Sequence, residues 1–178
     1  DFVIWAIDNN YGGIENLSLI PGNVGAAPIQ NIGAYGVELK DVFYSASGII
    51  LDSLQDFELN TSECKLSYRN SIFKDELKDK VIITSIKLKL TKVNHNYNIE
   101  YKDLKEKLSK SKLSLKKISD EIIKIRQSKL PDHKLIGNCG SFFKNPIINL
   151  SKLKTIKSDF PDLPSFKIDS NNYKIPAA

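Results

Sequence analysis

The chain has 178 residues, 41% of them hydrophobic and 26% charged, proportions typical of a soluble protein with one domain or one domain and part of another. No apolar run approaches twenty residues, so the sequence excludes a membrane-spanning helix. The formal charge of +5 comes mostly from lysines, which alternate with Leu and Ser along 102–117. That alternation favours solvated helix faces over a nucleic-acid-binding surface.

The two cysteines, Cys64 and Cys139, are far apart and show neither metal-ligand spacing nor a disulfide framework, so we expect reduced thiols in a cytoplasmic protein. The N-terminal sequence has no signal-peptide pattern. Methionine is absent, and the chain begins at Asp1 inside a predicted helix. It ends at KIPAA without a readable helix stop or strand partner. We therefore expect an internal piece of a longer protein, cut at both ends.

The first half of the chain predicts one helix and two strands. Apolar residues at helical spacing indicate a helix over 2–9, closed by Gly12-Gly13. Residues 41–50 are typical of a strand, and LDSLQDFEL continues after a turn. Residues 81–90 alternate as a half-buried strand does. In this last strand, the side chains predicted to point to the same face are those of Ile82, Thr84, Ile86, Leu88 and Leu90.

The second half predicts helices. Residues 101–108 form a short one, 114–128 a longer one, and 151–158 another that ends before Pro161. The longer helix carries an apolar stripe made of Leu115, Ile118, Ile122 and Ile125. Strands and helices are mixed without a regular βαβ repeat or an internal repeat, which predicts the α+β class.

Three segments have compositions that ordinary folding does not explain. The first, Ile20 to Gly36, is rich in Gly, Ala and Pro, so backbone N–H groups lie open to a flat or anionic ligand; a buried tight turn is the alternative. It matches neither a P-loop nor a dinucleotide fingerprint. The second contains Arg69, one of only two arginines, whose planar guanidinium suits a carboxylate or phosphate. A surface ion pair explains Arg69 equally well.

The third segment runs from Lys129 to Pro146 and contains Ser141 between glycine and two aromatic residues. No His/Asp partner has a recognisable spacing, so a hydrolase triad is not indicated. A serine acting as a general acid needs a site that stabilises its alkoxide, for which Lys129 and Lys144 are candidates. A structural serine in a turn remains the alternative from these residues alone.

Together the three segments resemble one enzyme family. GGIENLSLIPGNVGAAPIQNIGAYGVELKDV, CKLSYRNSIFK and IRQSKLPDHKLIGNCGSFFKNP are similar, in order and spacing, to the UDP-N-acetylenolpyruvoylglucosamine reductase family. The resemblance implies FAD bound in a two-lobed domain, NADPH as the reductant, and reduction of UDP-N-acetylglucosamine enolpyruvate to UDP-N-acetylmuramate for peptidoglycan. It implies a monomer without nucleic-acid, membrane or metal partners. Residues 1–129 then correspond to the FAD domain without its N-terminal lobe, and 130–178 to the start of an α+β substrate domain.

The resemblance also implies roles for single residues. Ser141 matches the proton donor, and Arg69 matches the arginine that stabilises the enolate-like intermediate. Tyr101, Lys129 and Asn145 match substrate-binding positions around the UDP group. The residues that match the cofactor-binding positions are Pro21, Gly22, Val24, Gly25, Ala26, Ala27, Pro28, Gln30, Asn31, Gly33, Ala34 and Arg126.

The chain departs from the family pattern at several points. Cys139 stands where a small residue is usual, and Phe166 stands where a tyrosine is expected near the substrate phosphates. The Gly-Ser-Asn loop for the FAD pyrophosphate and the partner glutamate are not found in the sequence. We therefore expect the isolated piece to be inactive. The alternative function is a truncated, non-catalytic remnant with at most weak nucleotide binding.

Overall fold

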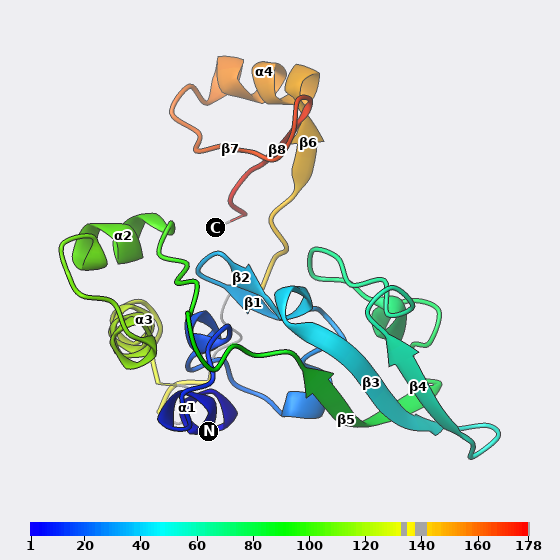
Figure 1. The fold of residues 1–178 in the computed structure, drawn as a ribbon. Helices are drawn as coiled ribbons and strands as arrows, with labels where there is room; N and C mark the ends of the chain where they lie inside the picture. The colour runs from blue at the N-terminus through cyan, green and yellow to red at the C-terminus, as the bar shows by residue number, and fades with distance from the viewer. Residues whose placement is uncertain (133–134, 138–141, 178) are drawn as a thin grey trace. The chain divides into compact units, whose positions relative to one another are not determined.

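The computed structural model describes residues 1–132, 135–137 and 142–177 and divides the chain into two compact units (Figure 1). Unit 1 is Asp1–Pro131 and unit 2 is Asp132–Ala178. Helices accompany sheets in which every described strand pair is antiparallel. The predicted α+β class is therefore confirmed, while the division into FAD and substrate domains stays a prediction.

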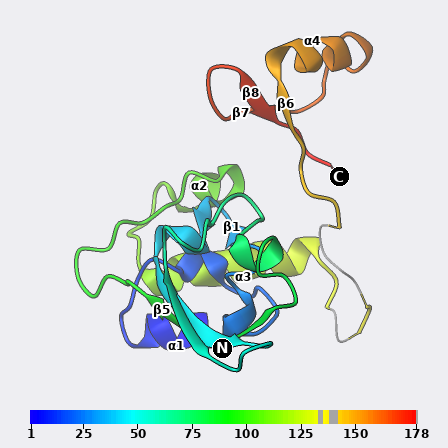
Figure 2. The ribbon, with the colours of Figure 1, turned by 90° about the vertical axis from the view of Figure 1, so that its right-hand side faces the viewer.

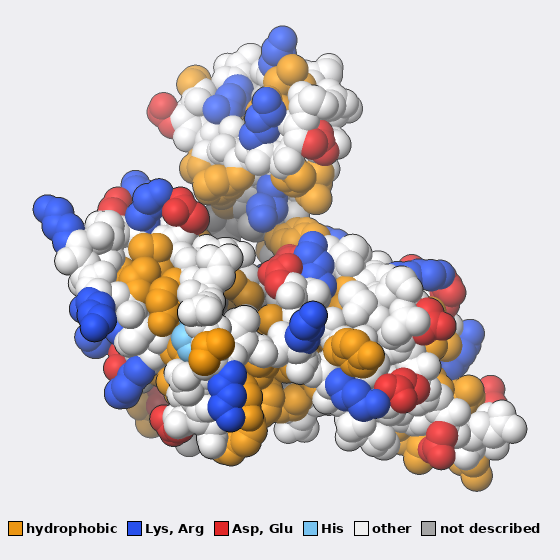
Figure 3. Space-filling model, viewed as in Figure 1, with side chains coloured by type: hydrophobic (Ala, Val, Ile, Leu, Met, Phe, Trp, Pro, Cys, Tyr) orange, Lys and Arg blue, Asp and Glu red, His pale blue; other side chains and the backbone are white. Residues whose placement is uncertain are grey.

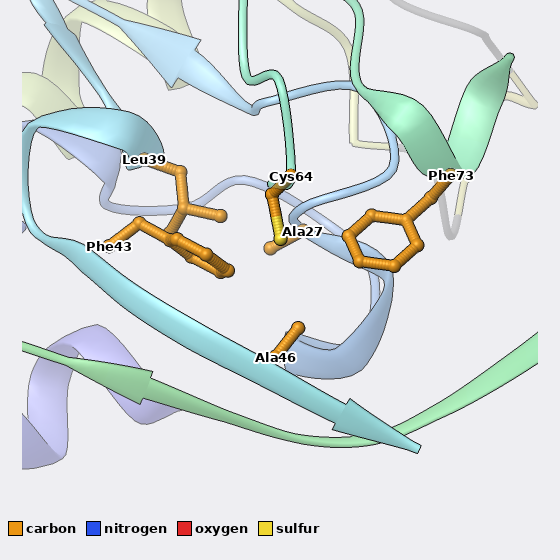
Figure 4. Packing of buried hydrophobic residues seen from close by; sticks show 6 residues of the cluster. All are labelled: Ala27, Leu39, Phe43, Ala46, Cys64 and Phe73. Atoms are coloured by element: carbon orange, nitrogen blue, oxygen red, sulfur yellow. The ribbon is translucent and has the colours of Figure 1, made fainter. Parts of the chain in front are cut away.

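Unit 1 is built on a three-stranded sheet of order β4-β3-β5. The strands are β3 (Phe43–Ile50), β4 (Asp56–Asn60) and β5 (Val81–Leu88), so the predicted strands over 41–50 and 81–90 are confirmed within a few residues. One face of the sheet packs on a core that also draws on neighbouring loops (Figure 4). Its buried members are Ala27, Leu39, Phe43, Ala46, Cys64 and Phe73.

The predicted inward face of β5 is wrong in the first half of the strand. Ser47 pairs with Ser85 but Gly48 pairs with Ile83, so Thr84 is an extra residue that forms a β-bulge. Because side chains alternate with a period of two, one extra residue exchanges the two faces. Ile83 therefore packs on the core, as Ile86 does beyond the bulge, whereas Ile82 is 54% exposed.

The helices of unit 1 confirm the sequence prediction. They are α1 (Phe2–Asp8), α2 (Lys102–Leu108) and α3 (Leu115–Lys129). Ser114 begins α3 by accepting a hydrogen bond from the Lys117 N–H, as expected of an N-cap serine. All four members of the predicted stripe on α3 are buried, and three of them pack with Leu104 and Leu108 of α2. In Figure 2, which is turned by 90° from the view of Figure 1, α3 lies behind the sheet.

Short elements connect these parts. The 3-10 helices are η1 (Glu15–Leu17), η2 (Val24–Ala26), η3 (Leu39–Asp41) and η4 (Ile72–Lys74), and a small hairpin joins β1 (Gly33–Ala34) to β2 (Val37–Glu38). A third cluster of buried residues, Ala6, Ile14 and Leu17, joins α1 to η1. The predicted Pro21–Gly36 segment thus contains η2 and β1, and it runs from the sheet core to the hairpin.

Unit 2 contains a second antiparallel sheet of order β6-β8-β7 beside one helix. Its elements are β6 (Ile147–Asn149), α4 (Leu150–Asp159), β7 (Phe166–Lys167) and β8 (Asn172–Lys174). The Asn149 side chain accepts a hydrogen bond from the Lys152 N–H at 2.8 Å and begins α4, so the helix predicted over 151–158 is confirmed.

The surface of the described residues is mixed in charge. On the face drawn in Figure 3, basic side chains are interspersed with acidic and apolar ones. Among the described residues, no helix is both long enough and apolar enough to cross a membrane.

Candidate functional site

The turn of the β1–β2 hairpin holds an unusual backbone. Tyr35 and Gly36 have φ values of 49° and 85°, which is the left-handed pair that a two-residue type I′ turn requires. Glycine adopts this conformation freely, but a bulky residue such as Tyr35 does so only where its surroundings compensate for the strain. The hairpin therefore places the Tyr35 side chain at an energetic cost.

Two asparagines compensate for this cost. Asn16 is buried, and its amide group donates to the carbonyl oxygens of Tyr35 at 2.8 Å and Asn98 at 2.9 Å. The Asn98 amide in turn donates to the Gly36 carbonyl at 3.0 Å. These hydrogen bonds satisfy backbone carbonyl groups of the turn and of Asn98 and so hold the turn in place.

Arg69 lies on the other side of the same hairpin. Its Nη2 donates to the Gly33 carbonyl at 2.6 Å, its Nη1 donates to the Asn31 carbonyl at 3.4 Å, and Nη1 lies 3.9 Å from a carboxylate oxygen of Glu38. A Cβ atom at Gly33 would lie 2.9 Å from Nη1, so only glycine permits this approach. The structure thus brings Arg69 against the predicted cofactor loop. A guanidinium has five N–H donors, so donors remain for an anion.

Asn31 has an internal role in this arrangement. Its side chain is fully buried, donates to Glu38 and to the Ser67 carbonyl, and accepts from the Lys40 N–H. All three of these hydrogen bonds of the side-chain amide are made to groups of the protein itself. Asn31 therefore fixes the loop and Glu38 beside Arg69.

A second group of predicted residues converges on Tyr35. The rings of Tyr35 and Tyr101 meet edge to face with centroids 5.0 Å apart, and Tyr35 packs on the core between α2 and α3. The pKa of Tyr35 is raised because the ring is partly buried and because Tyr101 and Asp103 are near, while Arg126 and Lys129 act in the opposite direction. Two cationic residues and two phenols thus share one corner of unit 1.

The two cations in this corner differ in their contacts. Lys129, the last residue of α3, forms an ion pair with Asp103 of α2; this hydrogen bond raises the pKa of Lys129 and lowers that of Asp103. Arg126 is half-buried, and its Nε has no hydrogen-bond partner in the part of the chain that the structure describes. A buried N–H without a partner costs free energy.

The predicted cofactor positions before the hairpin divide into exposed and buried ones. Pro21, Gly22, Val24, Ala26 and Gln30 are exposed, Gly25 and Ala34 are half-buried, and Ala27 and Pro28 are buried. Ala27 and Pro28 anchor the segment on the core of the sheet, because Ala27 is one of the buried members of that core.

Val24 and Gly25 line an open pocket of about 610 Å³. The other side of this pocket consists of aromatic rings of α1 and the following loop, Phe2, Trp5 and Tyr11, with residues of β5. The Trp5 ring stacks on Phe2 and Tyr11 with centroids 5.8 and 6.0 Å apart. Flat apolar walls beside exposed backbone suit a planar aromatic ligand.

In unit 2 the structure places only part of the predicted site. The side-chain oxygen of Asn145 accepts a hydrogen bond from the Ala177 N–H at 3.0 Å, which ties the chain before β6 to the C-terminal segment. Phe166 is 57% exposed. Ser141 and Cys139 lie outside the described residues, so the predicted proton donor has no described geometry. The described residues hold no cluster of His, Cys, Asp or Glu suited to a metal ion.

Sequence reasoning missed four residues of this site: Asn16, Tyr35, Asn98 and Asp103. Gly36 is the one local signal, because glycine suits the second position of a type I′ turn. The contacts of Asn16 with Tyr35 and Asn98 span 19 and 82 residues, and that of Asp103 with Lys129 spans 26. Nothing in a local sequence pattern indicates contacts over such separations.

Comparison with known proteins identifies relatives along almost the whole chain. No protein-family model matches it. A protein of Flavobacterium johnsoniae named UDP-N-acetylenolpyruvoylglucosamine reductase is 51% identical over 99% of this chain and 53% of its own length. Proteins of the same name from Amoebophilus asiaticus and Neisseria gonorrhoeae are 46% and 42% identical, each over 99% of this chain and 52% of their own length. The chain thus spans about half the length of these relatives.

The fold agrees with this similarity. The crystal structure of UDP-N-acetylenolpyruvylglucosamine reductase (MurB) from Thermus caldophilus matches 99% of this chain and 58% of its own chain with a TM-score of 0.58, at 19% identity. At that identity the match concerns the fold, whereas the curated relatives establish homology in sequence. Over the length that it spans, the chain belongs to the UDP-N-acetylenolpyruvoylglucosamine reductase family.

Proposed function

We propose that this chain supplies part of a cytoplasmic, FAD-dependent enzyme that uses NADPH to reduce UDP-N-acetylglucosamine enolpyruvate to UDP-N-acetylmuramate, a peptidoglycan precursor. The observation that supports this most is 51% identity along 99% of the chain to a protein named for that reductase activity. The convergence of Arg69, Tyr101 and Lys129 on one hairpin supports it independently.

The residues present fit a flavin. Val24, which is exposed, and Gly25, which is half-buried, line a pocket with aromatic walls, which suits the stacking of a planar ring. We assign the segment from Pro21 to Ala34 to the flavin side of the site. When bound, FAD would supply the hydride that NADPH provides and that C3 of the enolpyruvyl group accepts. The protein residues bind, orient and exclude water.

Arg69 carries the electrostatic part of the reaction in this proposal. When the hydride reaches C3, negative charge develops on the substrate carboxylate and C2, and the guanidinium stabilises it. Contacts with the carbonyl oxygens of Gly33 and Asn31 fix the guanidinium plane before substrate arrives. A group held in advance needs no reorganisation during the reaction, so the barrier falls.

The remaining roles concern the nucleotide and the proton. Tyr101, Lys129 and Asn145 each match family positions that bind the UDP portion, and Arg126 matches a position on the flavin side. Ser141 donates the proton to C2, which completes addition of hydride and proton across the double bond. These assignments rest on the family motifs that the residues match.

The test separates the two half-reactions by stopped flow in the full-length protein that contains this chain. Ser141→Ala removes the proton donor. The enolpyruvyl substrate should then reoxidise the reduced flavin more slowly by a factor of roughly 10² to 10⁴, the usual contribution of a general acid. Reduction of the flavin by NADPH should keep its rate. Ser170→Ala, an exposed serine of unit 2, is the matched control. An equal loss in both half-reactions would instead assign Ser141 a structural role.

A further inference from the structure

Two ion pairs join α2 to α3, one at each end of the contact between them. Lys107 of α2 pairs with Glu121 of α3 at 2.9 Å, and Asp103 of α2 pairs with Lys129 at the end of α3. Between them lies the apolar contact of Leu104 and Leu108 with α3. Seven residues are too few for a stable isolated helix, so α2 keeps its place through these contacts.

Asp103 belongs to the end of α2 that carries Tyr101. Tyr101 is the residue before the first turn of α2, and its carbonyl accepts the N–H groups of Leu104 and Lys105 that begin the helix. The Asp103 side chain is 33% exposed and that of Lys129 is 54% exposed, so neither group alone is immobilised by burial. Their pairing fixes the ammonium group of Lys129 near the Tyr101 and Tyr35 rings.

The ion pair acts on both proposed nucleotide contacts at once. Without it the long Lys129 side chain regains rotamer freedom, and α2 loses one of its two ionic links to α3, the one at its first turn. A carboxylate beside Lys129 also competes with an anionic ligand, so its removal has two opposed effects. Preorganisation acts on Tyr101 and Lys129 together, whereas competition acts on Lys129 alone and at an exposed, screened position.

We infer that Asp103 is a positioning residue for the uridine nucleotide portion of the substrate: it holds Lys129 and the Tyr101 turn of α2 in the binding arrangement. This inference rests on the proposed function, and it adds a residue that contacts no reacting atom. Loss of the carboxylate should therefore weaken substrate binding without changing the chemical step.

Steady-state kinetics of the full-length enzyme test it with Asp103→Asn, which keeps the size of the side chain. The KM for the enolpyruvyl substrate should rise about three- to tenfold, the range expected for one partly exposed ion pair plus a freed side chain. The value of kcat and the rate of flavin reduction by NADPH should not change. Calorimetric titration with UDP should show a loss of affinity of similar size, and Asp103→Glu should restore most of it.

Glu121→Gln is the matched control, because it breaks the ion pair at the other end of the same helix contact. If a general loosening of α2 were the cause, Glu121→Gln would raise KM as much as Asp103→Asn does, and the inference would be overturned. An unchanged KM in Asp103→Asn overturns it too, and a lower KM shows competition instead of positioning. An unsubstituted enzyme that neither reduces the substrate nor binds UDP refutes the proposed function itself.

Discussion

Replacement of Asn16 by alanine tests whether the strained hairpin turn depends on a single buried amide. The change removes two hydrogen bonds, to the carbonyl oxygens of Tyr35 and Asn98, at a position that is 1% exposed. Each hydrogen bond contributes about 1 kcal/mol net, and two partly buried carbonyl groups lose a partner. The Asn16 Oδ1 has no partner among the described residues, so its removal returns part of that cost.

The expected net loss is therefore about 2 kcal/mol in the free energy of unfolding of unit 1. Urea denaturation measures it through the single tryptophan, Trp5, which lies in unit 1 and so reports that unit. With a slope of about 2 kcal/mol per molar urea, the midpoint should fall by roughly 1 M.

Asn23→Ala provides the control for the same chemical change. Asn23 is an exposed residue of the Pro21–Gly36 segment, and its side chain makes no capping hydrogen bond at η2. Its substitution should shift the midpoint by less than about 0.25 M. Equal midpoint shifts in the two variants, or no shift in Asn16→Ala, would refute the claim that Asn16 supports the turn.

Three further predictions concern the sheet, its core and the cofactor. Gly48→Ala should destabilise unit 1 by more than about 2 kcal/mol, because a Cβ there would lie 2.0 Å from the Ile82 carbonyl oxygen; an unchanged urea midpoint, measured through Trp5, would contradict this. Burial raises the pKa of the Cys64 thiol from 9.0 to about 11, so unfolded chains lose this proton first. The thiol's contribution to stability should be complete below pH 9 and fall as the pH rises towards 11. Cys64→Ala should therefore reduce the slope of the urea midpoints measured across that range. Purified by itself, the 178-residue chain should not retain stoichiometric FAD, because its sequence has no Gly-Ser-Asn loop for the pyrophosphate; a yellow protein with one flavin per chain would contradict this.

The sequence predicted where helices and strands occur better than it predicted which face of each strand is buried. The stripe on α3 was predicted correctly because a helix that buries one side repeats its apolar residues with a fixed period, whatever else surrounds it. The face of β5 was predicted wrongly because one extra residue, Thr84, reverses the alternation. A β-bulge depends on the partner strand, here at Gly48, where a side chain would collide with the Ile82 carbonyl. Local alternation contains no information about that partner.

The candidate site divides in the same way. Arg69, Lys129 and Tyr101 could be selected from long family motifs, and the structure brings Arg69 to Gly33 and Tyr101 to Tyr35. The residues that hold them, Asn16 and Asp103, were missed. Amide and carboxylate side chains are common on surfaces, and only their three-dimensional contacts distinguish a supporting role from solvation.

Strained backbone conformations and the hydrogen bonds that support them lie in one stretch of unit 1. Asn31, Tyr35 and Arg69 all have positive φ values, between 45° and 55°, and each either lies in the hairpin segment or contacts it. Strain of this kind persists only when neighbouring groups over-determine the conformation. The buried amides of Asn16 and Asn31 provide that determination from inside the protein. The geometry of the proposed binding site is thus a consequence of buried hydrogen bonds, and changes in stability and in binding at this hairpin should occur together.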